Sequence, residues 1–244
     1  MRNDSLVQMV GKWLKESSAT VIFSGAGMST ESGIPDFRSR NGLWTKTDPM
    51  QVASVQAMTH QYELFHEFYR IRLEALDQLR PHTGHEIIAE WELNGLVKSI
   101  ATQNVDGFHQ RSGSRRVYEL HGALKRIRCI EKAHPSDAAD FIDGKTCSIC
   151  GSRLRPGVVL FGENLPMDTW NQAFHEIQTS ELLIVIGTSL QVSPVNQLPS
   201  IAPGKKVLIN QEPVHGDVQF DAVLIGKAGE ILKQLNDALN EVKA

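Results

Sequence analysis

The hydrophobic positions follow two different spacings along the chain. Near both ends, apolar side chains recur every three or four residues and predict amphipathic helices, with core positions 6, 9, 10, 13 and 14 at the start and 231, 232, 235 and 239 at the end. Between these ends, short apolar runs alternate with helical patterns, at residues 19–23, 97–101, 117–119, 182–186 and 206–209. This alternation predicts an α/β fold with a parallel sheet and helices on both faces.

Two segments interrupt the alternation. Residues 39–80 contain aromatic and aliphatic positions that predict one or two helices, whereas residues 126–155 are polar, lack periodicity and contain every cysteine. Both segments are therefore interpreted as insertions into the α/β pattern.

Composition narrows the classes of function. With 244 residues and 41% hydrophobic composition, the chain is long enough to bury a substantial core. Its formal net charge of −3, without a long basic run, argues against nucleic-acid binding. The apolar runs are too short to cross a bilayer, and acidic residues follow Met1 too soon for a secretory signal. Three cysteines fit a reducing cytoplasm better than a disulfide framework.

The segment 21–38 carries the first chemical signal. An apolar run ends at Ser24, and Gly25 and Gly27 then allow a tight turn and a close approach to a ligand. Ser29 or Thr30 could cap a following helix whose N-terminus suits a pyrophosphate. The pattern is not the usual dinucleotide fingerprint, and by itself it also fits an ordinary strand–turn–helix junction.

Further motifs make the signal specific. Residues 102–109 read TQNVDGFH, residues 119–122 read ELHG, and residues 32–38 read SGIPDFR. Later come RPGVVLFGE at 155–163, GTSL at 187–190 and INQE at 209–212. In their order and spacing these segments resemble the sirtuin family, from about residue 20 to the end of the chain. The resemblance implies a Rossmann-like large domain of residues 1–38, 81–125 and 156–244, with NAD as cofactor. It also implies that the helical insertion 39–80 and the cysteine-containing insertion 126–155 form a small domain, with the active-site cleft between the two domains.

The same resemblance implies roles for individual residues. His121 matches the base that deprotonates a ribose hydroxyl of NAD, and Asn104 matches a residue that organises catalysis. Phe37 matches a gate that shields the reaction after nicotinamide leaves. His109 is expected to be structural. The cofactor-binding set comprises Gly25, Ala26, Gly27, Thr30, Phe37, Arg38, Gln103, Val105, Asp106, Thr188, Ser189, Asn210 and Glu212.

The implied reaction removes an acyl group from a protein lysine and yields nicotinamide, free lysine and O-acyl-ADP-ribose. Two backbone edges are expected to hold the acylated peptide by strand addition, one at Gly162 and Glu163 and the other at Leu190 and Val192. NAD hydrolysis and ADP-ribosyl transfer are enzymatic alternatives, and a non-catalytic NAD or ADP-ribose sensor is an alternative of another class. We also expect a monomer, without a nucleic-acid or membrane partner.

The metal motif departs from the family pattern of two CxxC pairs. Cys147 and Cys150 form an intact pair, but Cys129 is followed by Lys132 where a second cysteine is expected. A structural zinc ion requires four ligands. His134 or Asp137 could complete the site, or the module could have lost its metal.

The acyl specificity is open at this point. Tyr69 and Arg72 lie three residues apart on one predicted helix, and Ala53 occupies a position where sirtuins that prefer acidic acyl chains keep a small residue. A phenol and a guanidinium could bind a succinyl or malonyl carboxylate. The PDFR sequence at 35–38 is instead typical of plain deacetylases. Deacetylation and desuccinylation are therefore both retained.

Overall fold

The computed structural model describes residues 3–37, 42–214 and 216–241 and contains a large parallel sheet. Its strand order is β3-β2-β1-β7-β8-β9, and every neighbouring pair is parallel. The strands are β1 (Thr20–Ser24), β2 (Ser99–Thr102), β3 (Val117–Glu119), β7 (Leu182–Ile186), β8 (Lys205–Asn210) and β9 (Ala222–Ile225). The predicted α/β class is thus confirmed, and β9 is added to the predicted strands.

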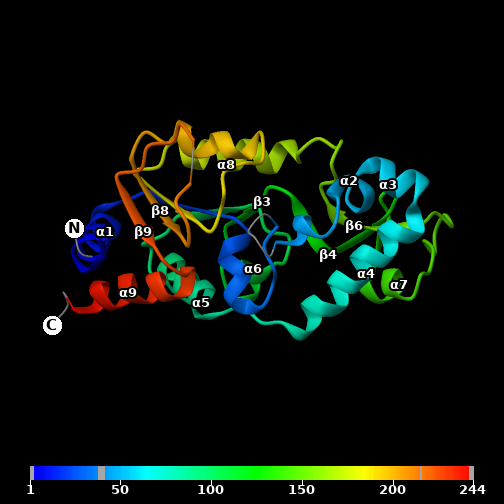
Figure 1. Cartoon of the computed structure of the whole chain (residues 1–244), viewed down its shortest axis with the longest axis horizontal. Helices are drawn as coiled ribbons and strands as arrows, with labels where there is room; N and C mark the ends of the chain where they lie inside the picture. Colours follow the sequence, from blue (N-terminus) through cyan, green and yellow to red (C-terminus); the bar gives the residue numbers. More distant parts are fainter. Residues whose placement is uncertain (1–2, 38–41, 215, 242–244) are drawn as a thin grey trace.

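Helices cover both faces of this sheet because successive strand residues point to opposite sides. Ile22 packs with α1 (Asn3–Glu16), α5 (Thr83–Leu93) and α9 (Ala228–Glu241). Its neighbours Val21 and Phe23 pack with α8 (Met167–Gln178) and the 3-10 helix η3 (Val195–Ile201). Figure 1 shows α8 on one side of the sheet and α5 and α9 on the other.

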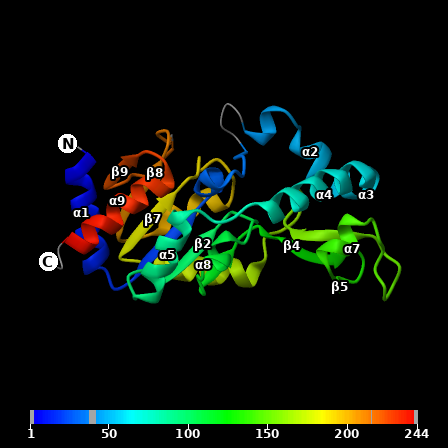
Figure 2. The same cartoon turned by 90° about the horizontal axis from the view of Figure 1, so that it is seen from below.

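A second, antiparallel sheet lies at the opposite end of the molecule, with its own core (Figure 2). Its strands β5 (Pro135–Ser136), β4 (Gly122–Cys129) and β6 (Leu154–Val158) are accompanied by α2 (Pro49–Val52), α3 (Val55–His60), α4 (Tyr62–Gln78) and α7 (Ala138–Ile142). The described part of 39–80 therefore holds three α-helices and the 3-10 turn η2 (Leu43–Thr45), more than the one or two helices expected. Asp48 and Ser54 cap α2 and α3 and separate them.

The carboxyl ends of β1, β2, β7 and β8 meet at one edge of the large sheet. The 3-10 helix η1 (Ala26–Ser32) follows β1, and the short helix α6 (Phe108–Arg111) lies beyond β2. The expectation of a helix capped by Ser29 or Thr30 is wrong: both residues lie inside η1, and its N-cap is Gly25, which has no side chain to form a capping hydrogen bond.

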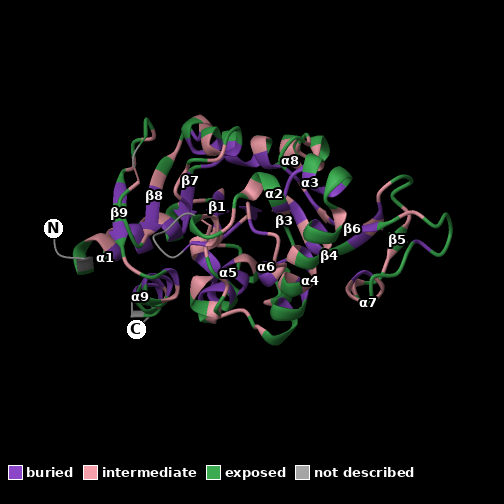
Figure 3. Cartoon of the chain, turned by 45° about the vertical axis from the view of Figure 1, so that its right-hand side comes forward, coloured by how far each residue is buried: buried purple, intermediate pink, exposed green. Residues whose placement is uncertain are grey.

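The buried residues follow the strands, whereas the outward faces of the helices are exposed (Figure 3). Within the described ranges, no helix is both long and apolar enough to cross a membrane.

Candidate active site

A cavity of about 1010 Å³ lies at the carboxyl edge of the large sheet and extends to the second sheet. Its volume is at the upper end for ligand sites, which suits a dinucleotide together with a second substrate. Most of the predicted site residues line it: Gly25, Ala26, Gly27, Phe37, Ala53, Tyr69, Arg72, Gln103, Asn104, Val105, His121, Gly162, Glu163, Thr188, Ser189, Val192, Asn210 and Glu212.

Three of the described residues predicted to bind cofactor or peptide are not part of this lining. Thr30 donates its hydroxyl hydrogen bond to the Gly27 carbonyl, and Asp106 lies behind Ser29 rather than in the cavity wall. Leu190 adopts a left-handed conformation (φ 53°) beside the wall and donates its N–H to the Thr188 hydroxyl. Arg38 lies outside the described residues.

The glycines after β1 are required by packing between two turns. A Cβ on Gly27 would lie 2.7 Å from the Gly187 Cα, and one on Gly25 would lie 2.8 Å from the Gly187 carbonyl oxygen. Gly187 itself has a positive φ of 62°. The turns after β1 and β7 therefore approach each other closely. This contact, rather than only a ligand, explains why glycine stands at both positions.

A hydrogen-bond network joins the turn after β1 to the segment after β2. Asn104 is buried, and its side-chain amide donates to the Ser29 hydroxyl at 3.1 Å. Ser29 in turn donates to the Asp106 carboxylate at 2.7 Å. Burial raises the pKa of Asp106, although the Phe108 N–H and the Ser29 hydroxyl partly offset this. The network fixes Asn104 in the cavity wall. Asp106 therefore influences the cavity through Ser29 and Asn104.

His121 lies at the start of β4 and is held to both neighbouring segments. Its Nδ1 lies 3.0 Å from the Gln103 carbonyl oxygen, and its own carbonyl accepts the Val159 N–H at 2.9 Å. Gln103 also donates its side-chain amide to the Thr188 hydroxyl at 3.0 Å. The predicted base is thus tied to the ends of β2 and β6 and faces the same cavity as Asn104.

The wall nearest α4 is aromatic and contains one cation. The Arg72 guanidinium lies 5.4 Å from the ring centroids of both Phe37 and Phe68, within cation–π range. Trp44 stacks on Phe37 at 5.1 Å. Burial lowers the pKa of Arg72, and no described carboxylate forms a salt bridge with it. Tyr69 is buried beside it, and burial raises its pKa.

The segment after β6 is fixed by an ion pair. The buried Arg155 donates to both Glu163 oxygens, at 2.5 and 2.9 Å, and the Leu160 N–H donates to the same carboxylate. Burial alone would raise the pKa of Glu163, but these hydrogen bonds hold it below the ordinary value. Ala53 and Phe161 are joined by a backbone hydrogen bond of 2.9 Å. The proposed peptide edge is therefore linked to the α2–α3 segment.

Sequence reasoning assigned no role to Trp44, Phe68 or Arg155, and it considered Ser29 only as a possible helix cap. Trp44 and Phe68 are separated by 24 positions, so their stacking is not visible in any local pattern. Arg155 lies within the quoted RPGVVLFGE motif, in which it precedes Glu163 by eight residues across an apolar run. This pairing of an arginine and a glutamate was the available signal for the ion pair.

Three cysteines and one histidine form a cluster of possible metal ligands beside the smaller, antiparallel sheet. One ligand atom from each of Cys129, His134, Cys147 and Cys150 lies within 4.8 Å of all the others. The Cys147–His134 and Cys129–Cys150 separations are 3.6 and 3.7 Å. A left-handed turn at Ala133 (φ 55°) returns the chain so that His134 meets Cys129. Asp137 is not part of this cluster.

This donor set fits zinc. Structural zinc sites are tetrahedral and accept three thiolates and one imidazole. Histidine therefore takes the place of the missing cysteine, and the site retains four ligands. The zinc module is degenerate in its sequence spacing but not in its number of ligands.

Comparison with known proteins places this geometry in a family. A model described as "Sir2 family" matches residues 25–194. An NAD-dependent protein deacetylase 1 from Geobacillus kaustophilus is 48% identical over 96% of this chain and 98% of its own length. A crystal structure of a Sir2 homologue with NAD superposes with a TM-score of 0.89 at 37% identity, covering 97% of this chain and 94% of that one.

A third relative is a Sir2 variant solved with a deacetylated p53 peptide and 3′-O-acetyl ADP-ribose. It superposes with a TM-score of 0.86 at 34% identity, covering 94% of this chain and 96% of that one. The parallel sheet and the cavity at its carboxyl edge are thus those of an NAD-dependent enzyme, and the cysteine–histidine cluster is compatible with a zinc module. The chain belongs to the Sir2 family.

Proposed function

We propose that this protein is an NAD-dependent protein-lysine deacylase. The observation that carries the proposal is that His121, Asn104 and Gln103 line one cavity together with residues 162–163, 188–189 and 191–192. A base and two backbone edges facing the same space suit a reaction between a nucleotide and an acylated peptide. The relatives named a deacetylase, or solved with NAD or with an acetylated ADP-ribose product, support this assignment.

NAD fits the cavity in size and in the polar groups that its wall offers. Thr188, Ser189, Asn210 and Glu212 would hold the adenosine and phosphate part, and Gln103 and Asn104 the nicotinamide ribose. Bound NAD supplies an anomeric carbon with nicotinamide as leaving group, toward which the acyl-lysine carbonyl oxygen is directed. The overall reaction would consume one water molecule and give free lysine, nicotinamide and O-acyl-ADP-ribose.

The residues of this chain contribute orientation and proton transfer. His121 accepts the proton of a ribose hydroxyl at Nε2, because its Nδ1 is committed to the Gln103 carbonyl. Phe37 and the Arg72–Phe68 wall exclude water from the reacting centre. Gly162 and Glu163 offer one backbone edge to the peptide, and the Arg155 ion pair holds that edge in place.

We further propose that the acyl pocket accepts acidic acyl chains as well as acetyl. Ala53, Tyr69 and Arg72 line the same cavity. Arg72 lies between two aromatic rings without a salt bridge to any described carboxylate. A succinyl or malonyl carboxylate would provide the charged partner that this guanidinium lacks within the described residues.

The zinc cluster supports a structural role for the metal. It lies beside the smaller, antiparallel sheet, and none of its four residues lines the central cavity.

The insertions 39–80 and 126–155 are proposed to form the small domain beside the large domain of 1–38, 81–125 and 156–244. The cysteines gather as thiols in the metal cluster instead of forming disulfides, which supports the cytoplasm as the location. The monomeric state stays a prediction.

The test of the function is an acetyl-lysine peptide incubated with the protein in the presence and absence of NAD. We expect loss of the acetyl group only with NAD, and no loss when NAD is replaced by ADP-ribose. Nicotinamide release with the peptide unchanged would instead identify an NAD hydrolase or transferase. NAD binding without any turnover would identify a sensor.

A further inference from the structure

A second concavity, of about 850 Å³, lies beside the central cavity and is rich in arginine. We call it the arginine groove and define it by Arg115, Arg116, Arg126 and Arg128. Arg115 and Arg116 precede β3, and the other two lie on β4. The first turns of α8 and the segment after β6 complete the lining. The four arginines have no role in the deacylation chemistry proposed above.

The acidic residues of the groove are already held by cations. Glu119 accepts a hydrogen bond from Arg126 at 2.9 Å, and Glu163 is bound by the buried Arg155. Arg115 and Arg128 form no salt bridge within the described ranges. The groove therefore carries excess positive charge, although the whole chain has a formal net charge of −3.

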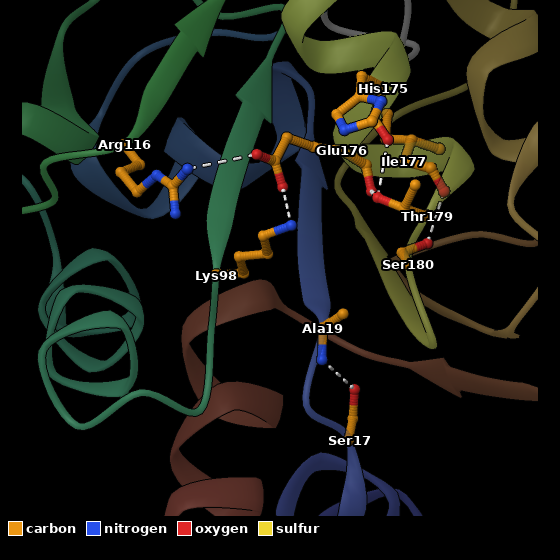
Figure 4. Close-up of polar contacts among 9 residues, drawn as sticks. All are labelled: Ser17, Ala19, Lys98, Arg116, His175, Glu176, Ile177, Thr179 and Ser180. Atoms are coloured by element: carbon orange, nitrogen blue, oxygen red, sulfur yellow. Dashed lines mark hydrogen bonds and ion pairs between the residues drawn. The ribbon is translucent and has the colours of Figure 1, made fainter.

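A buried carboxylate on α8 fixes one side of the groove. Glu176 is 7% exposed; its two oxygens face Arg116 at 3.4 Å and Lys98 at 2.9 Å. Figure 4 shows Arg116 and Lys98 each directed at a different oxygen of this one carboxylate. The single negative charge of Glu176 thus binds two cations, Arg116 and Lys98. The net charge of these three side chains is therefore positive, and the orientation of the Arg116 side chain is restrained.

The opposite side of the groove is a sheet surface. Arg126 and Arg128 lie on the same face of β4, because the residue between them, Ile127, is buried in the core on the other face. Arg128 is paired with Arg155 on β6, and Arg126 lies on the same strand at the register shift between Ala123 and Ile127.

The groove and the central cavity share a wall. Both are lined by Val158, Val159, Gly162, Glu163 and Asn164. This wall includes the backbone edge proposed to hold the acylated peptide. An extended peptide advances by roughly 3.3 Å per residue, so a segment a few residues from the acyl-lysine can pass from this edge into the groove.

We propose that the arginine groove binds an acidic segment of the protein substrate, next to the acylated lysine. This inference rests on the proposed function for the nature of the substrate. Guanidinium groups match carboxylates in geometry, and complementary charge increases both the selectivity and the rate of association. A nucleic-acid strand fits less well, because Tyr118 is the single aromatic residue of the lining and strand binding relies on aromatic stacking.

The test compares two peptides with the same acetyl-lysine, one flanked by aspartates and the other by asparagines. For the wild-type protein we expect kcat/KM to be about fivefold higher for the acidic peptide, with the difference lying in KM and shrinking as salt is added. The double substitution Arg115→Gln with Arg128→Gln should bring the ratio of the two kcat/KM values to about one. The matched control, Lys12→Gln with Lys15→Gln on α1, removes the same charge and should keep the wild-type ratio.

Peptide binding measured by fluorescence anisotropy without NAD separates this inference from the proposed function. Tighter binding of the acidic peptide that depends on Arg115 and Arg128 supports the groove even if no peptide is turned over. Equal affinity of the wild type for both peptides would overturn the inference. So would an unchanged ratio in the arginine variant, or a single-stranded oligonucleotide that binds the groove more tightly than the acidic peptide.

Discussion

The imidazole Nδ1 of His121 lies 3.0 Å from the backbone carbonyl oxygen of Gln103. A carbonyl oxygen only accepts hydrogen bonds, so the neutral imidazole carries its proton on Nδ1 and Nε2 is the basic nitrogen. Because Gln103 directly follows β2, this bond also sets the position of the ring relative to Asn104. This hydrogen bond gives His121 both the tautomer and the orientation that a general base requires.

Removal of this base gives the first prediction. His121→Ala should lower kcat by about 100-fold or more, because general-base catalysis typically contributes at least that factor. The NAD dissociation constant, measured by calorimetry, should stay close to the wild-type value. His60→Ala is the control, since His60 is exposed at the end of α3 and does not line the cavity. Substantial residual turnover of His121→Ala would refute the assigned role.

The acyl pocket gives the second prediction. Arg72→Met should lower kcat/KM for a succinyl-lysine peptide by about tenfold or more, because a charge-assisted hydrogen bond is lost. The acetyl-lysine peptide should be affected far less. Arg70→Met is the control, because Arg70 lies on the same helix but pairs with Glu67 and Glu74 at the surface. Equal losses on both peptides would show that Arg72 only shapes the pocket.

The metal cluster gives the third prediction. Protein purified without chelator should contain one zinc ion per chain, and His134→Ala should lose most of it and unfold about 5 °C lower. His134→Cys should retain the metal, since thiolate is an equivalent ligand. Asp137→Ala is the matched control for the alternative ligand. Full zinc content in His134→Ala, measured by mass spectrometry of the metal, would contradict the four-ligand assignment.

The Arg155–Glu163 pair predicts a pH dependence of stability. The folded state lowers the pKa of Glu163, so its stabilising contribution is complete above the ordinary carboxyl pKa and is lost as the pH falls through the lowered value. Glu163→Gln should therefore reduce the free energy of unfolding by about 1 kcal/mol at neutral pH. Denaturant titrations should show this difference shrinking in acid.

The control for this titration is Glu230→Gln on α9, where the glutamate is exposed and pairs with Lys227 at the surface. It should change stability little at any pH. A wild-type minus Glu163→Gln difference that grows as the pH falls would have the wrong sign for the ion pair described.

The contact between the turns after β1 and β7 gives the fifth prediction. Gly27→Ala should lower the thermal midpoint and weaken NAD binding, because its Cβ would lie 2.7 Å from the Gly187 Cα. Gly11→Ala in α1 is the control; its Cβ would meet only Ala238 at an ordinary 3.7 Å. That change should stabilise the helix by about 0.5–1 kcal/mol. Equal behaviour of the two variants would contradict the packing argument.

The sequence predicts the strands of the large sheet well because each is an apolar run of suitable length. The run at 182–186 is observed as β7, and that at 19–23 is shifted by one residue in β1. By contrast, β9 escapes prediction because its burial alternates, with Val223 and Ile225 exposed on an edge strand. The η1 segment also differs, since 3-10 geometry after Gly25 leaves no α-helix N-terminus for Ser29 to cap.

At the site, the motifs predict which segments meet, but not which side chains bind one another. The cation–π stacking of Arg72 on Phe37 joins residues 35 positions apart, on a loop and on α4. The choice of His134 over Asp137 depends on the left-handed turn at Ala133, and alanine gives no sequence signal for that conformation. Tertiary packing, rather than local pattern, decides both.

The central claim is tested most directly by the product ratio from one acyl-lysine peptide and NAD, followed by mass spectrometry. Deacylation through His121 predicts free peptide, nicotinamide and O-acyl-ADP-ribose in equal amounts, with no free carboxylic acid at early times. Nicotinamide formed in excess over free peptide, or free acid in place of O-acyl-ADP-ribose, would contradict the account.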